Sequence, residues 1–383
     1  MGRRPRAVAG VVVNRTFWQG KRVLVTGHTG FKGSWLALWL QELGAQVIGY
    51  ALDPPTDPNL FVAAEVGAGM TSVLADVRDL QQLMAVVEEH RPEIILHLAA
   101  QSLVRASYQA PVETYGSNVM GTVHALEVAR LSDCVRAVVI VTSDKCYANR
   151  EWVWGYRENE AMGGHDPYSS SKGCAELVTA AYRASYWGQG TSGRTVAVAS
   201  ARAGNVIGGG DWAKDRLVPD LLGALGRGDP LVARNPQAVR PWQHVLEPLS
   251  GYLTLAERLY RDGAKYADAW NFGPSADDVK PVRWIADRLT ALWGNGAAWH
   301  TDDGPHPHEA RLLTLDSSKA RESLGWRPRW TLDQALLHTV EWQKAYLRGE
   351  PMRALMLDQI HAYTAAGHDD PAPETRRTTR HEP

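Results

Sequence analysis

The sequence predicts an α/β protein with a parallel sheet covered by helices on both faces and a smaller lobe toward the C-terminus. Short apolar segments alternate with longer segments of helical periodicity from residue 21 to about residue 204. The short segments are continuously apolar, which is typical of strands buried on both faces. After residue 204, Gly, Pro, Asp and Trp become dense and the helical segments shorten, which indicates a second lobe.

The individual elements follow from these patterns in chain order. Six apolar segments, several of them rich in β-branched residues, are expected to form strands: 21–27, 45–53, 70–77, 92–100, 136–144 and 194–208. Four segments between them carry apolar residues at helical spacing: 33–44, 79–90, 112–132 and 166–187. Because each strand–helix–strand unit makes its two strands parallel, this order predicts a doubly wound sheet of the Rossmann type.

These elements divide the chain into parts. Residues 17–203, together with 240–273, are expected to form the Rossmann domain, and residues 204–239 with 274–355 the second lobe. Residues 1–16 are expected to be a flexible extension, because their apolar run is too short for a signal peptide. Residues 366–383 are polar and lack periodicity, so a disordered tail is expected there.

Composition excludes several classes of protein. With 383 residues, 44% hydrophobic and 22% charged, the chain is typical of a globular protein. The net charge of −1 gives no basic surplus for nucleic-acid binding, and no apolar run is long enough to span a membrane. The three cysteines have no CxxC spacing, so we expect neither a disulfide framework nor a metal site, and a cytoplasmic location.

A glycine-rich turn follows the first expected strand in "VLVTGHTGFKGSW". Gly27, Gly30 and Gly33 sit between a strand and a helix, where they permit a tight turn, close approach of a pyrophosphate, and close helix–sheet packing, respectively. This turn predicts a dinucleotide site. The acid usually found about 20 residues on, which binds a ribose, would be Asp53, although an Asp before Pro is also a common turn residue. Asp76 ends the next strand and could reach an adenine edge.

Tyr168 and Lys172 are four residues apart in "DPYSSSKGCAEL", a spacing that places both on one face of a helix. A lysine beside a phenol lowers the pKa of the phenol by stabilising phenolate. The result is a base suited to taking a proton from a hydroxyl as hydride leaves its carbon. The alternative is an aromatic–cation pair on the surface, which the preceding glycine-rich turn makes less favoured.

Several motifs together resemble the extended short-chain dehydrogenase/reductase family. They are TGxxGFxG at 26–33, HLAAQ at 97–101, Asn118 in "SNVMGT", Ser143, and YxxxK at 168–172. Within this family, the Ser143–Asp144 pair resembles the nucleotide-sugar 4,6-dehydratases. The strings "VTSDKCY", "REWVWGYRENE" and "RPWQHVLEPLSGYL" are similar to the members that act on CDP-glucose, and the resemblance covers about residues 17–350.

The resemblance implies a hydro-lyase that holds NAD tightly and acts on CDP-glucose. Hydride leaves C4, water is eliminated across C5–C6, and hydride returns to C6. Asp53 favours NAD because it would repel a 2′-phosphate, whereas Lys32 would attract one. The implied NAD contacts are Gly27, Thr29, Gly30, Phe31, Lys32, Gly33, Asp53, Asp76, Val77, Leu98, Ala99, Ala100, Asn118, Tyr168 and Lys172.

The same resemblance implies the catalytic roles. Ser143, Tyr168 and Lys172 would serve the oxidation at C4, and Asp144 would protonate the departing 6-hydroxyl. Lys145 stands where related enzymes carry a glutamate that acts as the base at C5. Two roles for it stay open, with the first favoured: a base with a depressed pKa, or an electrostatic stabiliser of the developing enolate.

The second lobe is implied to bind the CDP-sugar. The candidate substrate contacts are Gln101, Ser102, Asn205, Arg216, Arg240, His308 and Arg311. Segment 112–132 resembles the helix of the family's dimer interface, so we expect a homodimer or a tetramer. A nucleotide-sugar 4-epimerase is the first alternative, but it would have no use for the Asp144–Lys145 pair. A dinucleotide-binding protein without activity is the second, and the presence of Tyr168 and Lys172 disfavours it.

Overall fold

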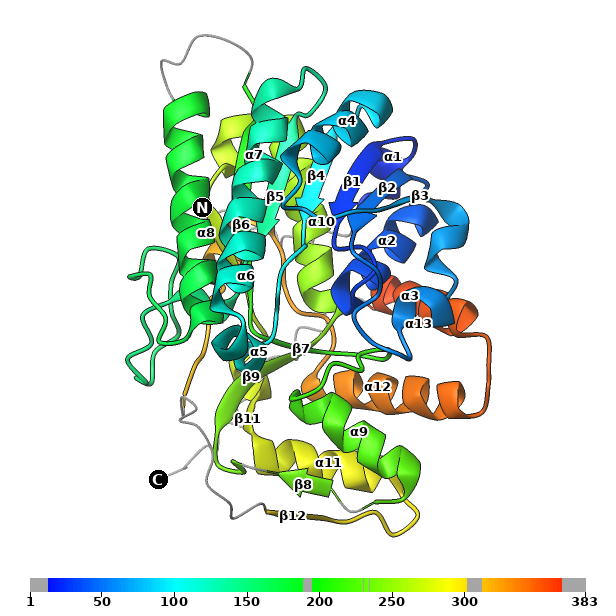
Figure 1. Ribbon diagram of the computed structural model, residues 1–383. Coiled ribbons are helices and arrows are strands. Elements are labelled where there is room, and N and C mark those ends of the chain that lie inside the picture. Colours follow the sequence, from blue (N-terminus) through cyan, green and yellow to red (C-terminus); the bar gives the residue numbers. More distant parts are fainter. Residues whose placement is uncertain (1–12, 189–194, 230, 234, 302–311, 367–383) are drawn as a thin grey trace, which may run out of the picture.

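A seven-stranded parallel sheet forms the centre of the protein (Figure 1). The computed structural model describes residues 13–188, 195–229, 231–233, 235–301 and 312–366. The strands run in the order β10-β6-β5-β4-β1-β2-β3, so the chain reverses direction across the sheet between β1 and β4. The predicted doubly wound fold is confirmed. The strands are β1 Arg22–Thr26, β2 Gln46–Ala51, β3 Thr71–Leu74, β4 Ile94–His97, β5 Ala137–Val141, β6 Ala197–Ala203 and β10 Ala269–Phe272.

Helices cover both faces of this sheet because its strands are apolar on both sides. In β1, Val23 and Val25 belong to one buried cluster, whereas Leu24 belongs to the other. The first cluster is closed by α1 Arg15–Trp18, α2 Phe31–Glu42, α10 Leu246–Asp262 and α13 Met352–Ala365. The second is closed by α4 Leu80–His90, α7 Gly121–Leu131 and α8 Pro167–Trp187.

The second lobe lies below the sheet in the view of Figure 1 and has its own apolar cluster. It is built on α9 Leu217–Arg227, α11 Val282–Trp293 and α12 Leu332–Leu347, with β8 Leu231–Ala233 paired to β12 Trp299–Thr301. A three-stranded sheet connects the two parts: β7 Asn205–Ile207, β9 Val239–His244 and β11 Val279–Pro281. The remaining helices are short: α3 Leu60–Ala63, α5 Val104–Gln109, α6 Pro111–Tyr115 and the π-turn Gly116–Met120.

The structure differs from the expected N-terminal extension at residues 13–16. Val13 is buried, and the Asn14 side chain caps α1 and donates to Glu257 at 3.1 Å. Residues 1–12 and the expected tail from 367 onward lie outside the described residues. Within the described part of the chain, no helix is both long and apolar enough to cross a membrane.

Candidate active site

A cavity of about 1790 Å³ lies at the carboxyl ends of the central strands and extends to the second lobe. This is where a doubly wound sheet binds its ligands, because the loops diverge at the strand-order reversal. Its volume exceeds the 300–1,000 Å³ typical of a site for one small ligand. Every predicted site residue that the structure describes lines this cavity, except Asn118. His308 and Arg311 lie outside the described residues.

The glycine-rich turn joins β1 to α2. Gly27 has φ +78°, and a Cβ there would lie 2.8 Å from the nitrogen of Ala99. A Cβ on Gly33 would lie 2.0 Å from the carbonyl oxygen of Gly27, so helix and turn meet backbone to backbone. A Cβ on Gly30 would meet only that same carbonyl, at 3.5 Å. Gly27 and Gly33 are thus required by packing, whereas Gly30 leaves open space at the N-terminus of α2, where an anion can bind.

The two acids predicted to reach a ribose or an adenine lie beyond β2 and β3. Asp53 is exposed at the cavity wall, two residues after β2 ends. Asp76 accepts hydrogen bonds from the backbone nitrogen and the guanidinium of Arg78 at 2.8 and 2.9 Å. The bond from the Arg78 side chain lowers the pKa of Asp76, so this carboxyl is an anion already paired within its own loop.

Asn118 lies behind the cavity wall and is 1% exposed. Its Oδ1 accepts from the Gln101 nitrogen at 2.8 Å, and its Nδ2 donates to the Gln101 carbonyl at 2.9 Å and to Ser171 Oγ at 2.8 Å. All of its polar atoms are therefore used within the protein. Asn118 thus fixes the loop after β4, whose residues Gln101 and Ser102 line the cavity, and its contact with NAD stays a prediction.

Ser143, Asp144 and Lys145 follow β5 and begin a 3₁₀ turn over Asp144–Cys146. Ser143 Oγ donates to Asp144 Oδ1 at 3.0 Å and accepts from the Lys145 nitrogen at 3.2 Å. Asp144 is 1% exposed, and no group among the described residues donates to its Oδ2. Lys145 Nζ lies 3.9 Å from Asp144 Oδ1, and its side chain is 33% exposed. The buried carboxyl of Asp144 and the partly exposed amine of Lys145 thus line the same cavity.

Tyr168 and Lys172 lie on the first turns of α8, which Asp166 caps by accepting from the Ser169 nitrogen. Burial raises the pKa of Tyr168 to about 12, although a hydrogen bond with Ser143 opposes this. Burial lowers the pKa of Lys172 to about 8, and its Nζ donates to the Val141 carbonyl at 3.2 Å. The raised pKa of Tyr168 is opposite to the lowered phenol pKa expected from the four-residue spacing, because burial favours the neutral phenol.

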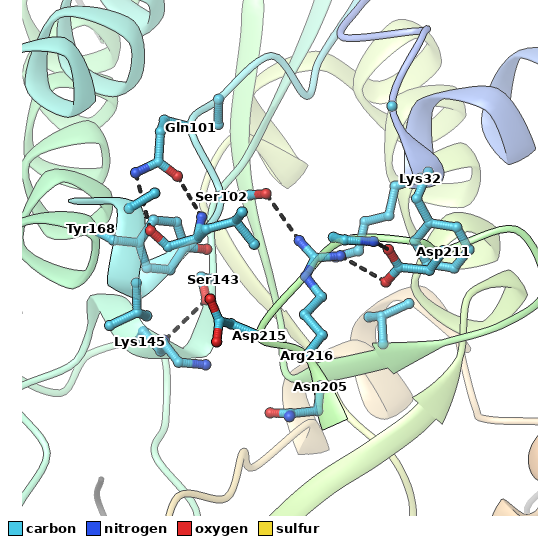
Figure 2. Close-up of a pocket in the computed structure, with 18 of the residues that line it drawn as sticks. Lys32, Gln101, Ser102, Ser143, Lys145, Tyr168, Asn205, Asp211, Asp215 and Arg216 are labelled. Carbon is cyan, nitrogen blue, oxygen red and sulfur yellow. Dashed lines mark hydrogen bonds and ion pairs between the residues drawn. The ribbon is translucent and has the colours of Figure 1, made fainter. Parts of the chain in front are cut away.

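Arg216 reaches across from the second lobe to the loop after β4. Figure 2 shows its guanidinium between Ser102 and Asp211, to which it donates at 2.9 and 2.8 Å. Lys32 lies on the same side of the cavity. Burial lowers the pKa of Lys32 to about 7, and the charge of Arg216 adds to this effect. The Arg216 guanidinium, together with Lys32 when it is protonated, makes this wall suited to phosphate groups.

Two further predicted substrate contacts lie on the three-stranded connecting sheet. Asn205 begins β7 and is aimed into the open part of the site (Figure 2); within the described residues its buried Oδ1 has no donor. Arg240 in β9 lines the cavity and donates to the carbonyl of Val239 at 2.9 Å. An unpaired buried acceptor is costly unless a ligand satisfies it, so Asn205 marks a polar contact.

Sequence reasoning missed a buried ion pair beneath the site. Glu176 and Arg202 lie 2.8 Å apart, with side chains only 4% exposed. Arg202 also donates to Tyr147, a cavity residue that the sequence did not single out. One signal was present: Glu176 continues the four-residue spacing of Tyr168 and Lys172 along the same helix face. Its partner on β6 is distant in the chain, and only the fold brings the two together.

Comparison with known proteins places this geometry among nucleotide-sugar enzymes. Residues 24–339 match the family model described as GDP-mannose 4,6 dehydratase. A CDP-glucose 4,6-dehydratase of Salmonella typhimurium is 56% identical over 93% of this chain and 99% of its own length. A dTDP-glucose 4,6-dehydratase of Xanthomonas campestris is 25% identical over 83% of this chain and 92% of its own.

Solved structures with the same fold are more distant in sequence. The dTDP-glucose 4,6-dehydratase of Bacillus anthracis, solved in complex with NAD, has a TM-score of 0.70 at 22% identity, covering 88% of this chain and all of that one. The UDP-glucose 4-epimerase of Stenotrophomonas maltophila has a TM-score of 0.74 at 22% identity, covering 86% and 99%. At such identities the likeness extends to the fold alone.

Proposed function

The chain belongs to the GDP-mannose 4,6 dehydratase family, and from this premise we infer that it converts CDP-glucose to CDP-4-dehydro-6-deoxyglucose and water. The observation that carries this inference is the 56% identity, over nearly the full length of both chains, to a CDP-glucose 4,6-dehydratase. The reaction class is that of a hydro-lyase. An acid beside an amine at the end of β5, where an elimination needs both, supports the same conclusion.

NAD is the cofactor, held by the enzyme between turnovers. The residues fit it: the open space at Gly30 admits a pyrophosphate at the start of α2, and Lys32 adds positive charge there. Asp53 and Asp76 line the same cavity, and they are the proposed contacts of a ribose and of an adenine edge, respectively. When bound, NAD would supply the hydride transfer of the reaction, at C4 and then at C6 of the sugar. Thr29, Phe31, Val77, Leu98, Ala99 and Ala100 complete the proposed wall.

Oxidation at C4 needs a base for the 4-hydroxyl, and Tyr168 has that role. Its phenol must lose a proton, which burial opposes by raising its pKa to about 12. The hydrogen bond with Ser143 favours the phenolate. We propose that protonated Lys172, one helical turn further along α8, favours it as well. Ser143 and Tyr168 therefore share the proton, while Lys172 supplies the compensating charge.

Elimination across C5–C6 needs a base at C5 and an acid at O6. Asp144 is the acid: it is buried, and its unsatisfied Oδ2 is free to present a proton to the departing hydroxyl. Lys145 is the base at C5. Its amine lies 3.9 Å from the Asp144 carboxyl, so the two groups can serve adjacent carbons. Electrostatic stabilisation of the enolate is the competing role for this lysine.

The second lobe, residues 204–239 and 274–355, holds the CDP moiety, and residues 17–203 with 240–273 hold NAD. Arg216 and Arg240 suit the diphosphate because a guanidinium can donate two hydrogen bonds at once. Asn205 and Gln101 contact the sugar nucleotide, as does Ser102, which shares the Arg216 guanidinium. His308 and Arg311, outside the described residues, complete the proposed contacts.

The protein assembles as a homodimer, with a tetramer as the larger alternative. The interface is the face of α6–α7 and α8, whose helices pack against each other and expose apolar side chains: Val112, Met120, Leu131 and Leu177. Exposed apolar surface of this kind marks an interface. A cytoplasmic location agrees with the three cysteines, all of which are free thiols.

One incubation tests the function. Purified protein with CDP-glucose and NAD should produce a 4-keto sugar, detected by its absorbance in strong base, and one equivalent of water. Conversion to a CDP-linked 4-epimer would instead identify an epimerase, and unchanged CDP-glucose would contradict the proposal. To decide between NAD and NADP as the cofactor, each is added to enzyme freed of cofactor, and the one that restores activity is identified.

A further inference from the structure

A buried carboxylate lies directly behind the groups of the oxidation step. Glu176 is on α8, four residues after Lys172 and eight after Tyr168, so the three share one side of the helix. Its residue is 5% exposed, and it does not line the cavity. Any influence of Glu176 on the reaction must therefore pass through its neighbours.

Both oxygens of this carboxylate are used to join three elements. Oε1 accepts from the Thr142 hydroxyl, and Oε2 accepts from Ser200 Oγ at 2.6 Å and from Arg202 at 2.8 Å. Thr142 directly precedes Ser143, so Glu176 ties the helix of Tyr168 to the end of β5. A buried carboxylate with three donors is held in one place, because each lost bond would leave a polar group unsatisfied.

Arg202 extends the same network to the cavity wall. Its NH1 donates to Tyr147 Oη at 2.6 Å and to the Glu158 carbonyl at 3.0 Å. The Tyr147 hydroxyl in turn donates to Asn271 Oδ1 at 2.8 Å, and Tyr147 is one of the residues that line the cavity. Glu176 thus links Thr142 on one side of the catalytic groups to Tyr147 on another.

The charge of Glu176 also acts on Lys172. Burial lowers the pKa of Lys172 to about 8, and the Glu176 carboxylate opposes that effect. A neutral residue at 176 would leave the Arg202 cation unbalanced and make protonated Lys172 less favourable. Among the described residues, the other titratable or charged groups around this part of the site include Lys32, His97, Asp144, Lys145, Asp166, Tyr168 and Arg216.

We propose that Glu176 is a positioning residue for the oxidation at C4. It holds Thr142, and with it Ser143, in register with Tyr168 and Lys172, and through Arg202 it fixes Tyr147 at the cavity wall. This proposal rests on the proposed dehydratase function. Small displacements of a catalytic group can cost about 100-fold in rate, so a contact that sets the register is expected to be visible in kcat.

Three variants separate geometry, charge and folding. Glu176→Gln keeps the shape and removes the charge, whereas Glu176→Asp keeps the charge and shortens the reach. Glu247→Gln is the matched control: Glu247 is a fully buried glutamate on α10 that accepts from Trp330 and Tyr363, and it does not line the cavity. For each, kcat and KM with CDP-glucose, the pH dependence of kcat/KM, and the thermal unfolding midpoint are measured on the NAD-loaded enzyme.

Glu176→Gln should lower kcat about 10- to 100-fold and leave KM within about threefold of the wild-type value. Because the Glu176 carboxylate raises the pKa of Lys172, this variant should also lose kcat/KM at a lower pH, so that the alkaline limb of its pH profile moves to lower pH. Glu176→Asp should lower kcat and leave that limb in place. Glu247→Gln should lower the unfolding midpoint alone. Wild-type kcat and pH profile in Glu176→Gln, or equal kinetic changes in Glu247→Gln, would overturn the proposal.

A fourth variant covers the case in which Glu176→Gln does not fold. Thr142→Val is nearly isosteric and removes only the hydroxyl that donates to Glu176, so kcat should fall without movement of the alkaline limb. Unchanged kcat in Thr142→Val would then overturn the positioning role. Wild-type enzyme that leaves CDP-glucose intact is a different result, since it contradicts the proposed function itself.

Discussion

Asp144 and Lys145 are adjacent in the sequence, and the Asp144 carboxyl lies 3.9 Å from the Lys145 amine, yet the two side chains differ sharply in exposure. The aspartate side chain is 1% exposed and that of the lysine 33%. The 3₁₀ turn after β5 produces this difference, because it directs Asp144 inward, where Ser143 donates to it, while the Lys145 amine stays in reach of water. An acid shielded from water and an amine able to exchange its proton is the arrangement that elimination requires.

Lys145→Ala tests whether the amine takes the proton at C5. If it does, the variant should lose exchange of the C5 hydrogen with solvent deuterium by about 100-fold or more, since general-base catalysis contributes about that much. Mass spectrometry of the recovered CDP-sugar measures the exchange. Lys265→Ala, at an exposed lysine beside Tyr266, is the control. Exchange at the wild-type rate in Lys145→Ala would leave only the electrostatic role.

Asp144→Asn tests the acid. Without a proton to give, the variant should still oxidise C4 but lose elimination by about 100-fold or more. In a single turnover, the absorbance of reduced nicotinamide should therefore appear and persist, whereas in the wild type it should be transient. Equal loss of the absorbance change and of product would instead assign Asp144 to oxidation.

The pH dependence of kcat/KM should report Lys172. Burial depresses its pKa from 10.5 to about 8, so the ammonium loses its proton as the pH rises through about 8. Since the charged form favours the Tyr168 phenolate, kcat/KM should fall above that pH. Lys172→Arg keeps a charge that does not titrate in this range, and its alkaline limb should disappear even if its maximal rate is lower. A limb that persists at the same pH would exclude Lys172 as its source.

Gly33→Ala and Gly30→Ala should separate folding from cofactor binding. The new Cβ at residue 33 meets the Gly27 carbonyl at 2.0 Å, so we expect a loss of about 1–3 kcal/mol in stability, as overpacking typically costs. At residue 30 the nearest backbone atom is 3.5 Å away, and the φ of −81° suits any residue. This variant should unfold at the wild-type temperature and bind NAD more weakly. Thermal unfolding and NAD titration distinguish the two.

The fold class could be predicted because it depends on local patterns. Continuous apolar strands alternating with amphipathic helices admit few arrangements other than a covered parallel sheet, and the strand order has that form. The glycine-rich turn could be predicted for the same reason. Gly27 and Gly33 are required by contacts within one βα unit and with the residues that follow the neighbouring strand β4. The hydrogen bonds between Asn118 and the backbone of Gln101 could not be predicted from local patterns, because they depend on where the fold places the loop that carries Gln101.

The sequence by itself determined the chemistry-bearing residue types, their order at the strand ends, and the family to which the chain belongs. Only the tertiary structure decided in which direction burial shifts the pKa of each catalytic side chain. It sets Tyr168 above its ordinary pKa and Lys172 below, because the interior disfavours whichever form is charged. It also decided that Glu176 meets Arg202 and Thr142, since three segments far apart in the chain converge there. Spacing along a chain predicts a shared helix face, whereas solvation and long-range partners exist only once the chain has folded.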